Sequence, residues 1–163
     1  MNYTYSLIYN SPSVSRSDGA TIPADLGNTD WRQYQEWLAQ GNTPTPVPLD
    51  IYKNNQRGKI SSACSSTITG GFQSSALGAA HTYPSDSTTQ GNVDRIAISG
   101  AGGSVWCGDS SNIWSFAQHT AAQVSQVQKD MVAFIQTQQT KYSTLVAQIT
   151  AATTVEQVEA VNW

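Results

Sequence analysis

The sequence predicts an α+β protein with a small N-terminal β-hairpin plus helix, a middle region of short strands, and a long C-terminal helix. Aromatic and small residues alternate in YTYSLIY near the start, which favours a strand. In the middle, the runs SVWCGD and NIWSFA flank a turn sequence and indicate a β-hairpin. From Thr120 to Ile149, apolar residues recur every three or four positions, as in an amphipathic helix.

Composition bounds the functions that this chain can have. Its 163 residues carry a net charge of −3, and only 12% of them are charged. We therefore expect no electrostatic attraction to nucleic acid. The sequence has no apolar run long enough to insert in a membrane, and its start has neither the basic nor the apolar segment of a signal peptide. A surface so poor in charge suits extensive contact with other copies or other chains.

The N-terminal module is expected over residues 1–43. A strand lies within Tyr3–Tyr9, and two short extended pieces flank Asp18–Gly19, a dipeptide typical of tight hairpin turns. A helix then begins at Asp30, whose carboxylate and Gln33 form the two ends of a capping motif. Gly41–Asn42 ends this helix in a left-handed conformation.

One face of this first helix is aromatic. Trp31, Tyr34 and Leu38 recur at helical spacing, with Trp37 beside them. A segment of this size is too small to bury a core of its own. We therefore expect these three side chains to form a docking face for another surface, either in the rest of the chain or in a neighbouring protein.

A linker is expected over residues 44–59. The three prolines between Pro44 and Pro48 favour extended polyproline geometry and a semi-rigid spacer. The segment Lys53–Lys59, KNNQRGK, carries three cations in seven residues. It is interpreted either as a solvated linker or as a contact for phosphate or lipopolysaccharide.

The remaining domain, residues 60–163, begins with short strands and loops over residues 60–119. Only Ser87–Ile96 reaches helical length in that region. The two runs around Asp109–Ser111 form the predicted hairpin, on which Trp106 and Trp114 lie near one another and form a small apolar centre.

The long helix is expected over residues 120–149. Thr120 and Gln123 form a capping box, which makes Ala121 the first helical residue. Its apolar seam follows a 3-4 alternation through four heptads: Ala121, Val124, Gln128, Met131, Ile135, Gln138, Tyr142, Leu145 and Ile149. This pattern predicts a coiled coil, and the wide stripe favours a homotrimer or a helix that packs on its own globular part. A short final helix over residues 153–161 begins with a capping box of Thr153 and Glu156.

No catalytic, cofactor-binding or metal-binding motif is found in the sequence, so we expect a protein that is not an enzyme and needs no cofactor. His119 is expected to satisfy a backbone group at the start of the long helix. His81 forms either a turn network with Asp86 or a metal pair. Cys64 and Cys107 lack the C-x-x-C spacing, which leaves buried free thiols, a disulfide or a metal site.

Two stretches resemble known proteins. The segment SDGATIPADLGNTDWRQYQEWLAQGNTPTP, residues 17–46, is similar to an N-terminal stretch of small bacteriophage tail and tail-fibre proteins. The segment from Cys64 to Trp163 resembles a domain of unknown function found in phage tail proteins, on the motifs TGGFQSSALGAAHTYPSD, VWCGDSSNIWSFAQHTAAQVSQV and LVAQITAATTVEQVEAVNW. The resemblance implies a virion component of the tail, made in the cytoplasm of the bacterial host.

Three roles follow from that resemblance. The first is a structural baseplate or tail-fibre attachment protein, expected as a homotrimer that contacts other tail, baseplate and fibre proteins. The second is a tail-fibre assembly chaperone. The third is a receptor-binding tip that contacts a host surface glycan through Trp106, Trp114 and Tyr83.

Overall fold

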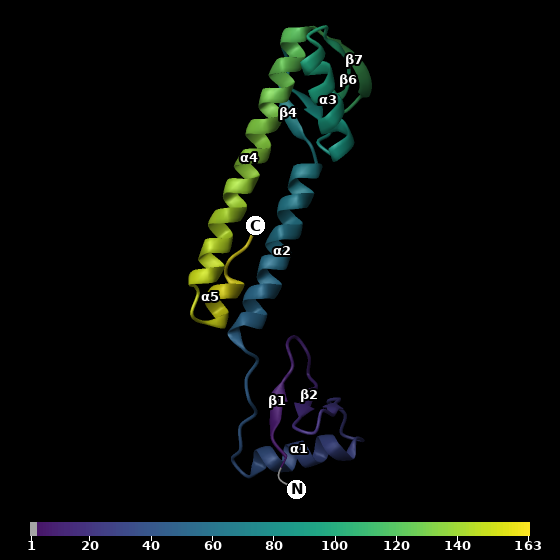
Figure 1. Ribbon diagram of the computed structural model, residues 1–163. Helices are drawn as coiled ribbons and strands as arrows, with labels where there is room; N and C mark the ends of the chain where they lie inside the picture. The colour runs from purple at the N-terminus through teal and green to yellow at the C-terminus, as the bar shows by residue number, and fades with distance from the viewer. Residues whose placement is uncertain (1–2) are drawn as a thin grey trace.

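The protein is elongated, with a small module at one end, a helical rod, and a mixed α/β head at the other end (Figure 1). The computed structural model describes residues 3–163. It combines helices with two small antiparallel sheets, ordered β1-β2-β3 and β4-β5-β6-β7, which confirms the α+β class. The elements are β1 (Tyr5–Leu7), β2 (Val14–Arg16), β3 (Thr21–Ile22), α1 (Thr29–Ala39), α2 (Leu49–Thr69), β4 (Phe72–Ser74), β5 (His81–Tyr83), α3 (Ser87–Ser99), β6 (Gly103–Gly108), β7 (Trp114–His119), α4 (Ala121–Ala151) and α5 (Val155–Glu159).

The N-cap of the first helix lies two residues earlier than predicted. The N-cap of α1 is Asn28, whose side-chain oxygen accepts hydrogen bonds from the backbone of Asp30 at 2.8 Å and of Trp31 at 3.3 Å. The prediction that Asp30 caps this helix is therefore wrong. Its carboxylate lies in the first turn and accepts a hydrogen bond from Arg16 at 2.8 Å, which joins α1 to β2. The predicted left-handed end is confirmed, because Gly41 has φ +85°.

The predicted docking face is covered by the module's own sheet. Tyr34 is buried in a cluster with Tyr5, and the two rings lie 4.9 Å apart. Trp31 and Leu38 are partly buried against the same cluster. The N-terminal module thus has a small core of its own: three short strands supply the surface that the helix face needs.

The proline-rich spacer runs beside β1. Thr45 forms a parallel bridge with Ser6, with backbone hydrogen bonds of 2.9 Å from Leu7 and 2.8 Å to Tyr5. Beyond the spacer, the ring of Tyr9 packs edge-on against Tyr52 in α2, with 5.0 Å between the ring centroids. The spacer is therefore held at both ends.

The chain is helical where a linker was predicted. The 21 residues of α2 include the basic segment Lys53–Lys59, so the prediction of a linker up to residue 59, followed only by short elements, is wrong. Two cations of this segment reach the last turn of α4. Lys53 donates to the backbone carbonyl of Thr150 at 3.0 Å, and Arg57 donates to the hydroxyl of Thr150 at 3.1 Å. A cation is favourable there because the carbonyls at a helix C-terminus lack partners within the helix.

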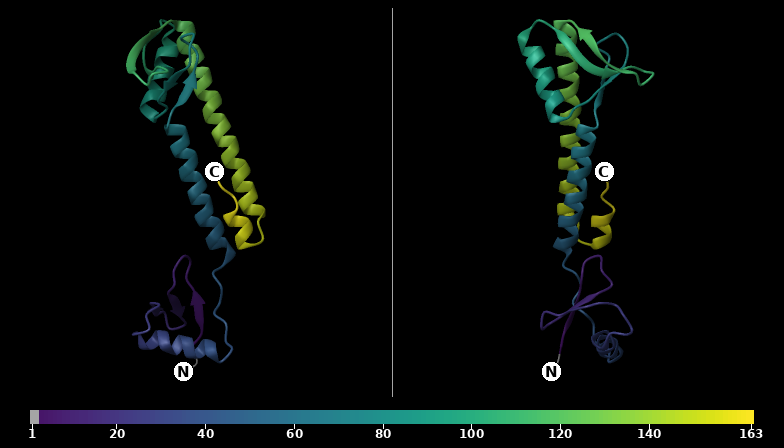
Figure 2. Two further views of the ribbon diagram at one scale, coloured as in Figure 1. Left: turned by 180° about the vertical axis from the view of Figure 1, so that it is seen from behind. Right: turned by 90° about the vertical axis from the view of Figure 1, so that its right-hand side faces the viewer.

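The rod consists of α2 and α4, which lie side by side and run in opposite directions (Figures 1 and 2). The capping box that begins α4 is confirmed, since Thr120 and Gln123 each bond the other's backbone. The N-cap of α5 is Thr154, one residue after the predicted Thr153. A small buried cluster joins the three helices to the C-terminal segment: Ile60, Ile149, Ala152, Val158 and Val161.

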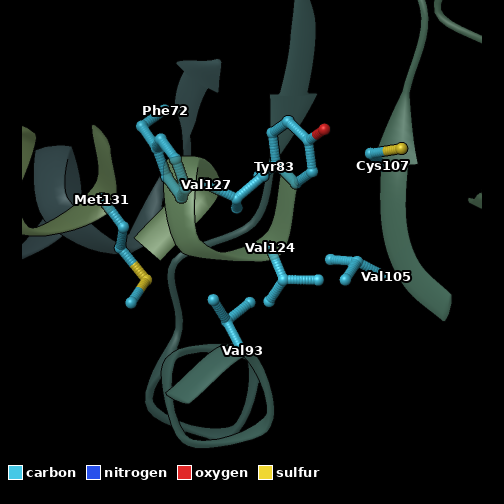
Figure 3. Packing of buried hydrophobic residues seen from close by; sticks show 8 residues of the cluster. All are labelled: Phe72, Tyr83, Val93, Val105, Cys107, Val124, Val127 and Met131. Atoms are coloured by element: carbon cyan, nitrogen blue, oxygen red, sulfur yellow. The ribbon is translucent and has the colours of Figure 1, made fainter. Parts of the chain in front are cut away.

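The head is built on the first half of α4. The four-stranded sheet and α3 enclose the largest buried cluster, which includes Phe72, Tyr83, Val93, Val124 and Val127 (Figure 3). The β6–β7 hairpin is present as predicted, and α3 extends three residues past the predicted Ile96. Among the described residues, no helix is both long and apolar enough to cross a membrane.

Candidate binding face of the β6–β7 hairpin

The predicted coiled-coil seam packs within its own chain. Val124 and Met131 are buried in the head core, with Ile135 packed against it. Ile149 is buried in the rod cluster, against which Tyr142 and Leu145 are partly buried.

Both glutamine positions of the seam also contact the same chain. The Gln128 side chain donates to Asp94 of α3 at 3.0 Å, and the backbone carbonyl of Gln138 accepts from the Cys64 thiol of α2 at 3.8 Å. The α4 stripe therefore contacts α2, α3 and the sheet, as expected for a helix that packs on its own globular part.

The histidines have structural partners. His119 is 1% exposed, and its Nδ1 lies 2.8 Å from the Ala117 carbonyl. A carbonyl can only accept, so in the neutral ring Nδ1 carries the proton and Nε2 accepts from the Tyr83 hydroxyl at 2.8 Å. The predicted pairing of His81 with Asp86 is wrong, because that carboxylate caps α3 through the backbone of Thr88 and Thr89.

Both cysteines are free and buried. Burial raises the pKa of the Cys107 thiol, which makes the thiolate a minor species near neutral pH. Across residues 3–163, no group of three or more His, Cys, Asp and Glu side chains could hold a metal ion. Of the open alternatives for Cys64 and Cys107, the structure therefore shows the free thiols.

Tyr83 does not lie on the surface. Its side chain is fully buried, and desolvation raises its pKa well above the ordinary value. The ring stacks on Phe72 with 5.6 Å between centroids, and its hydroxyl points toward Cys107 (Figure 3). The prediction that Tyr83 contacts a host glycan is therefore wrong.

The outer face of the β6–β7 hairpin carries three aromatic side chains. Trp106 pairs with Phe116 across the two strands, and their ring centroids lie 4.9 Å apart. The ring of Trp106 also lies nearly parallel to that of Trp114, with 6.2 Å between the ring centroids and 26° between the ring planes. Trp106 is 38% exposed and Phe116 is 70% exposed. The predicted proximity of the two tryptophans is confirmed, but they form an exposed aromatic strip (Trp106, Trp114 and Phe116) and no interior centre.

The alternation of β-strands explains why the strip faces outward. Val105 and Cys107 point into the head core, so their neighbour Trp106 points away from it. The sequence predicted that the two tryptophans form a small apolar centre on the hairpin, without deciding which face of the sheet they lie on. The interior positions are instead filled by smaller side chains from β6 and by α4.

Trp114 is held flat on the hairpin. Its indole lies over Gly108, where an added Cβ would come within 2.8 Å of the ring. The indole nitrogen donates to Asn112 in the turn at 2.9 Å. Asp109 closes that turn by accepting from the backbone of Ser111 and Ile113, each at 2.9 Å. One end of the aromatic strip is thus held in place by contacts within the hairpin.

A groove lies between α3 and the aromatic strip. Its volume is about 540 Å³, and the rings of Trp106 and Phe116 form part of its wall. Polar lining comes from Thr89, Asn92 and Arg95 of α3 and from Ser104 of β6; no carboxylate lines it. We call this hollow the α3–β6 groove.

Sequence reasoning missed two residues of this face. The outward position of Phe116 was readable from WSFAQH, because it is two residues from Trp114 and therefore on the same side of a strand. Arg95 carried no comparable signal. Its place beside β6 depends on how α3 packs across the sheet, which no local pattern in the sequence specifies.

These features define a helical rod whose head presents a fixed aromatic surface. Residues 51–162 match the family described as "Domain of unknown function (DUF4376)", and the chain belongs to that family. The match begins in the first turn of α2 and covers the rod and the head. No curated protein and no solved structure matches the chain.

Proposed function

We propose that the chain is a structural component of a bacteriophage tail, which connects tail parts in the virion at the baseplate or the fibres. The proposal combines the resemblance of residues 17–46 and 64–163 to phage tail proteins with the elongated form of the molecule. The observation that carries it is the rod. With 31 residues, α4 spans about 46 Å, and it separates the head from the N-terminal module.

The surface of the rod suits permanent contact with neighbouring proteins. Of the three charged residues in α4, Asp130 accepts a hydrogen bond from Ser74 at 2.6 Å, and Lys141 lies 4.4 Å from the centre of the Trp163 ring. Only Lys129 makes no such contact within residues 3–163. Apart from Lys129, the outer surface of α4 consists mainly of Gln, Thr, Ser and small apolar residues, so most of it can be buried without desolvating a charge, which is the costly part of burying a polar surface.

The homotrimer is part of this proposal, and its interface lies on the outer surface of the rod. The seam of α4 already contacts α2 and the head, so it is not available to another copy. Val132 is 44% exposed on α4, and it borders a shallow hollow with Lys129, Ala133 and Gln136. This surface provides an apolar contact that a partner copy can cover.

Light scattering coupled to size exclusion tests the trimer. The wild type is expected near three times 17.5 kDa, and Val132→Lys is expected to dissociate into monomers that keep their helical circular dichroism. Gln148→Lys is the matched control, because it adds the same charge at an exposed position about 160° further round α4. A wild type that runs as one chain at high concentration contradicts the trimer.

Mass spectrometry of purified phage particles tests the place in the virion. A structural tail protein is expected in fixed proportion to the other tail proteins after repeated purification. An assembly chaperone that leaves the particle gives the opposite result: abundant protein in the infected cell and none in the particles. That outcome would overturn the proposed function.

A further inference from the structure

We propose that the α3–β6 groove binds an acidic saccharide. The inference rests on the proposed function, since it gives the head of a phage tail component a ligand. The sequence suggested only a glycan contact through aromatic side chains. The groove adds a role for Arg95 and with it the charge of the ligand.

The apolar side of a sugar ring fits the aromatic strip. A pyranose has faces of C–H groups that stack on flat aromatic rings, and such stacking needs rings that are exposed and held in place. Trp106 and Phe116 meet at 4.9 Å with part of each ring open to solvent. Trp114 extends the strip; its indole nitrogen donates to Asn112, and its ring packs over Gly108, which has no side chain.

The hydroxyls of a sugar fit the polar edge of the groove. Ser104 lines the groove and donates its hydroxyl proton to Oε1 of Gln118 at 3.0 Å, so its oxygen keeps acceptor capacity for a ligand. The side chain of Asn92 lines the groove and forms no hydrogen bond within the described part of the chain. Thr89 donates its hydroxyl proton to Asp86 and keeps acceptor capacity. A purely apolar partner would leave these groups unpaired, which is unfavourable.

The acidic group of the ligand is inferred from Arg95. Arg95 is exposed, lines the groove, and has neither an ion pair nor a side-chain hydrogen bond within residues 3–163. The adjacent Asp94 accepts from Gln128 of α4. An arginine fork that no carboxylate neutralises matches a carboxylate or phosphate on a ligand. A single cation on a chain of net charge −3 is a poor match for the repeated phosphates of nucleic acid.

The experiment uses the full chain and a panel of purified acidic oligosaccharides from bacterial capsules and lipopolysaccharides. Each probe is paired with its carboxyl-reduced neutral form, and binding is followed by calorimetry and tryptophan fluorescence. At least one acidic probe is expected to bind, and its neutral form is expected to bind with at least tenfold lower affinity. Trp106→Ala should abolish binding. Arg95→Gln should lower the affinity for the acidic probe about tenfold and leave the affinity for its neutral form unchanged.

The controls separate lost binding from lost fold. Arg32→Gln removes an exposed arginine of α1, away from the groove, and should bind like the wild type. Arg95→Gln should keep the wild-type thermal transition, because Arg95 is exposed and has no partner in the fold. Trp106→Ala loses the ring contacts with Phe116 and Trp114, so its transition should shift to a lower temperature but stay cooperative, because Trp106 lies outside the buried clusters.

Two results would overturn the proposal: no binding across the acidic panel, or wild-type affinity in both groove variants. Binding to host cells gives a further test. Loss after periodate oxidation supports a saccharide, whereas loss after protease treatment alone assigns this face to a protein partner. Neither failure affects the presence of the chain in purified particles, so the proposed function is tested separately.

Discussion

The hydroxyl of Tyr83 donates to Nε2 of His119 across 2.8 Å and thereby joins the end of β5 to the last residue of β7. These two strands are not neighbours in the sheet, because β6 lies between them. The other ring nitrogen of His119 is occupied by the Ala117 carbonyl. A fully satisfied polar pair therefore lies inside the head core.

Removal of the Tyr83 hydroxyl should destabilise the head. Tyr83→Phe leaves Nε2 of His119 buried without a donor, and an unsatisfied buried acceptor costs about 1–3 kcal/mol. Urea unfolding, followed by circular dichroism, measures the change in the free energy of unfolding. The control is Tyr52→Phe, whose hydroxyl forms no hydrogen bond within residues 3–163. Equal stability of the two variants would show that the hydrogen bond contributes nothing measurable.

The C-terminal segment should be released by a change at Gln56. This side chain is 5% exposed, and its amide donates to the Val161 carbonyl at 2.6 Å. Gln56→Ala leaves that carbonyl unpaired, with an expected cost of about 1–3 kcal/mol. Hydrogen exchange should accelerate in α5 and spare the β6–β7 hairpin. Gln139→Ala, at an exposed position of α4, is the matched control. Unchanged exchange in α5 would contradict this role.

Acid should weaken the start of α3 through Asp86. Hydrogen bonds from the Thr89 side chain and backbone lower the pKa of this carboxyl below its ordinary value of 3.8. Because the folded-state pKa is the lower one, its stabilisation is fully present above the ordinary value and is lost as the pH falls through the folded value. Asp86→Asn keeps a capping side chain that does not titrate. The variant should therefore lose less stability than the wild type between pH 5 and pH 2.5. The difference between the two losses should equal the stabilisation that the one Asp86 carboxylate provides.

Thermal unfolding across that pH range tests the Asp86 prediction. Glu36→Gln is the control, since this carboxylate is exposed on α1 and forms no side-chain hydrogen bond within the described residues. Identical pH profiles for Asp86→Asn and the wild type would contradict the prediction.

The two thiols should react slowly in the native protein. Cys64 and Cys107 are 8% and 2% exposed, and burial raises the pKa of the Cys107 thiol. A thiol reagent at pH 8 is expected to label neither residue until denaturant is added, and then to label two thiols per chain. Non-reducing mass spectrometry gives an independent check. A mass two hydrogens lower would reveal a disulfide and require a different arrangement of α2 and β6.

The elements with strong local signals were predictable from the sequence. Thr120 and Gln123 fixed the start of α4, and the turn around Asp109 fixed the β6–β7 hairpin. The helix α2 was missed because Gly58 and the Ser/Thr-rich second half have weak helix propensity, and because burial against α4 overrides that propensity. A signal was present: Gln56, Ile60 and Cys64 recur every four residues and are the buried positions of α2.

The candidate site was predictable only in part. The adjacency of Trp106 and Trp114 follows from a hairpin, but their exposure depends on which face the sheet turns toward α4. Tyr83 was misplaced for the same reason: a lone aromatic residue in a short strand has no local signal that decides between core and surface. Arg95 comes to the groove through the packing of α3 on β6, a contact between elements that the sequence does not encode locally.

The antiparallel rod has a mechanical consequence. A pull between the N-terminal module and the head enters at Leu49 and acts along the axis of α2, whose hydrogen bonds would then open one turn after another. The last turns of α4 lie beside that entry point, bonded to Lys53 and Arg57 and packed with Ile60 through Ile149. The contacts between α2 and α4 are therefore loaded in shear, so that α4 carries part of the tension. Many of these contacts must break together before α2 can lengthen. The packing of α4 against α2 therefore makes the rod resistant to extension. That resistance depends on the rate of unfolding under load more than on the equilibrium stability of the fold.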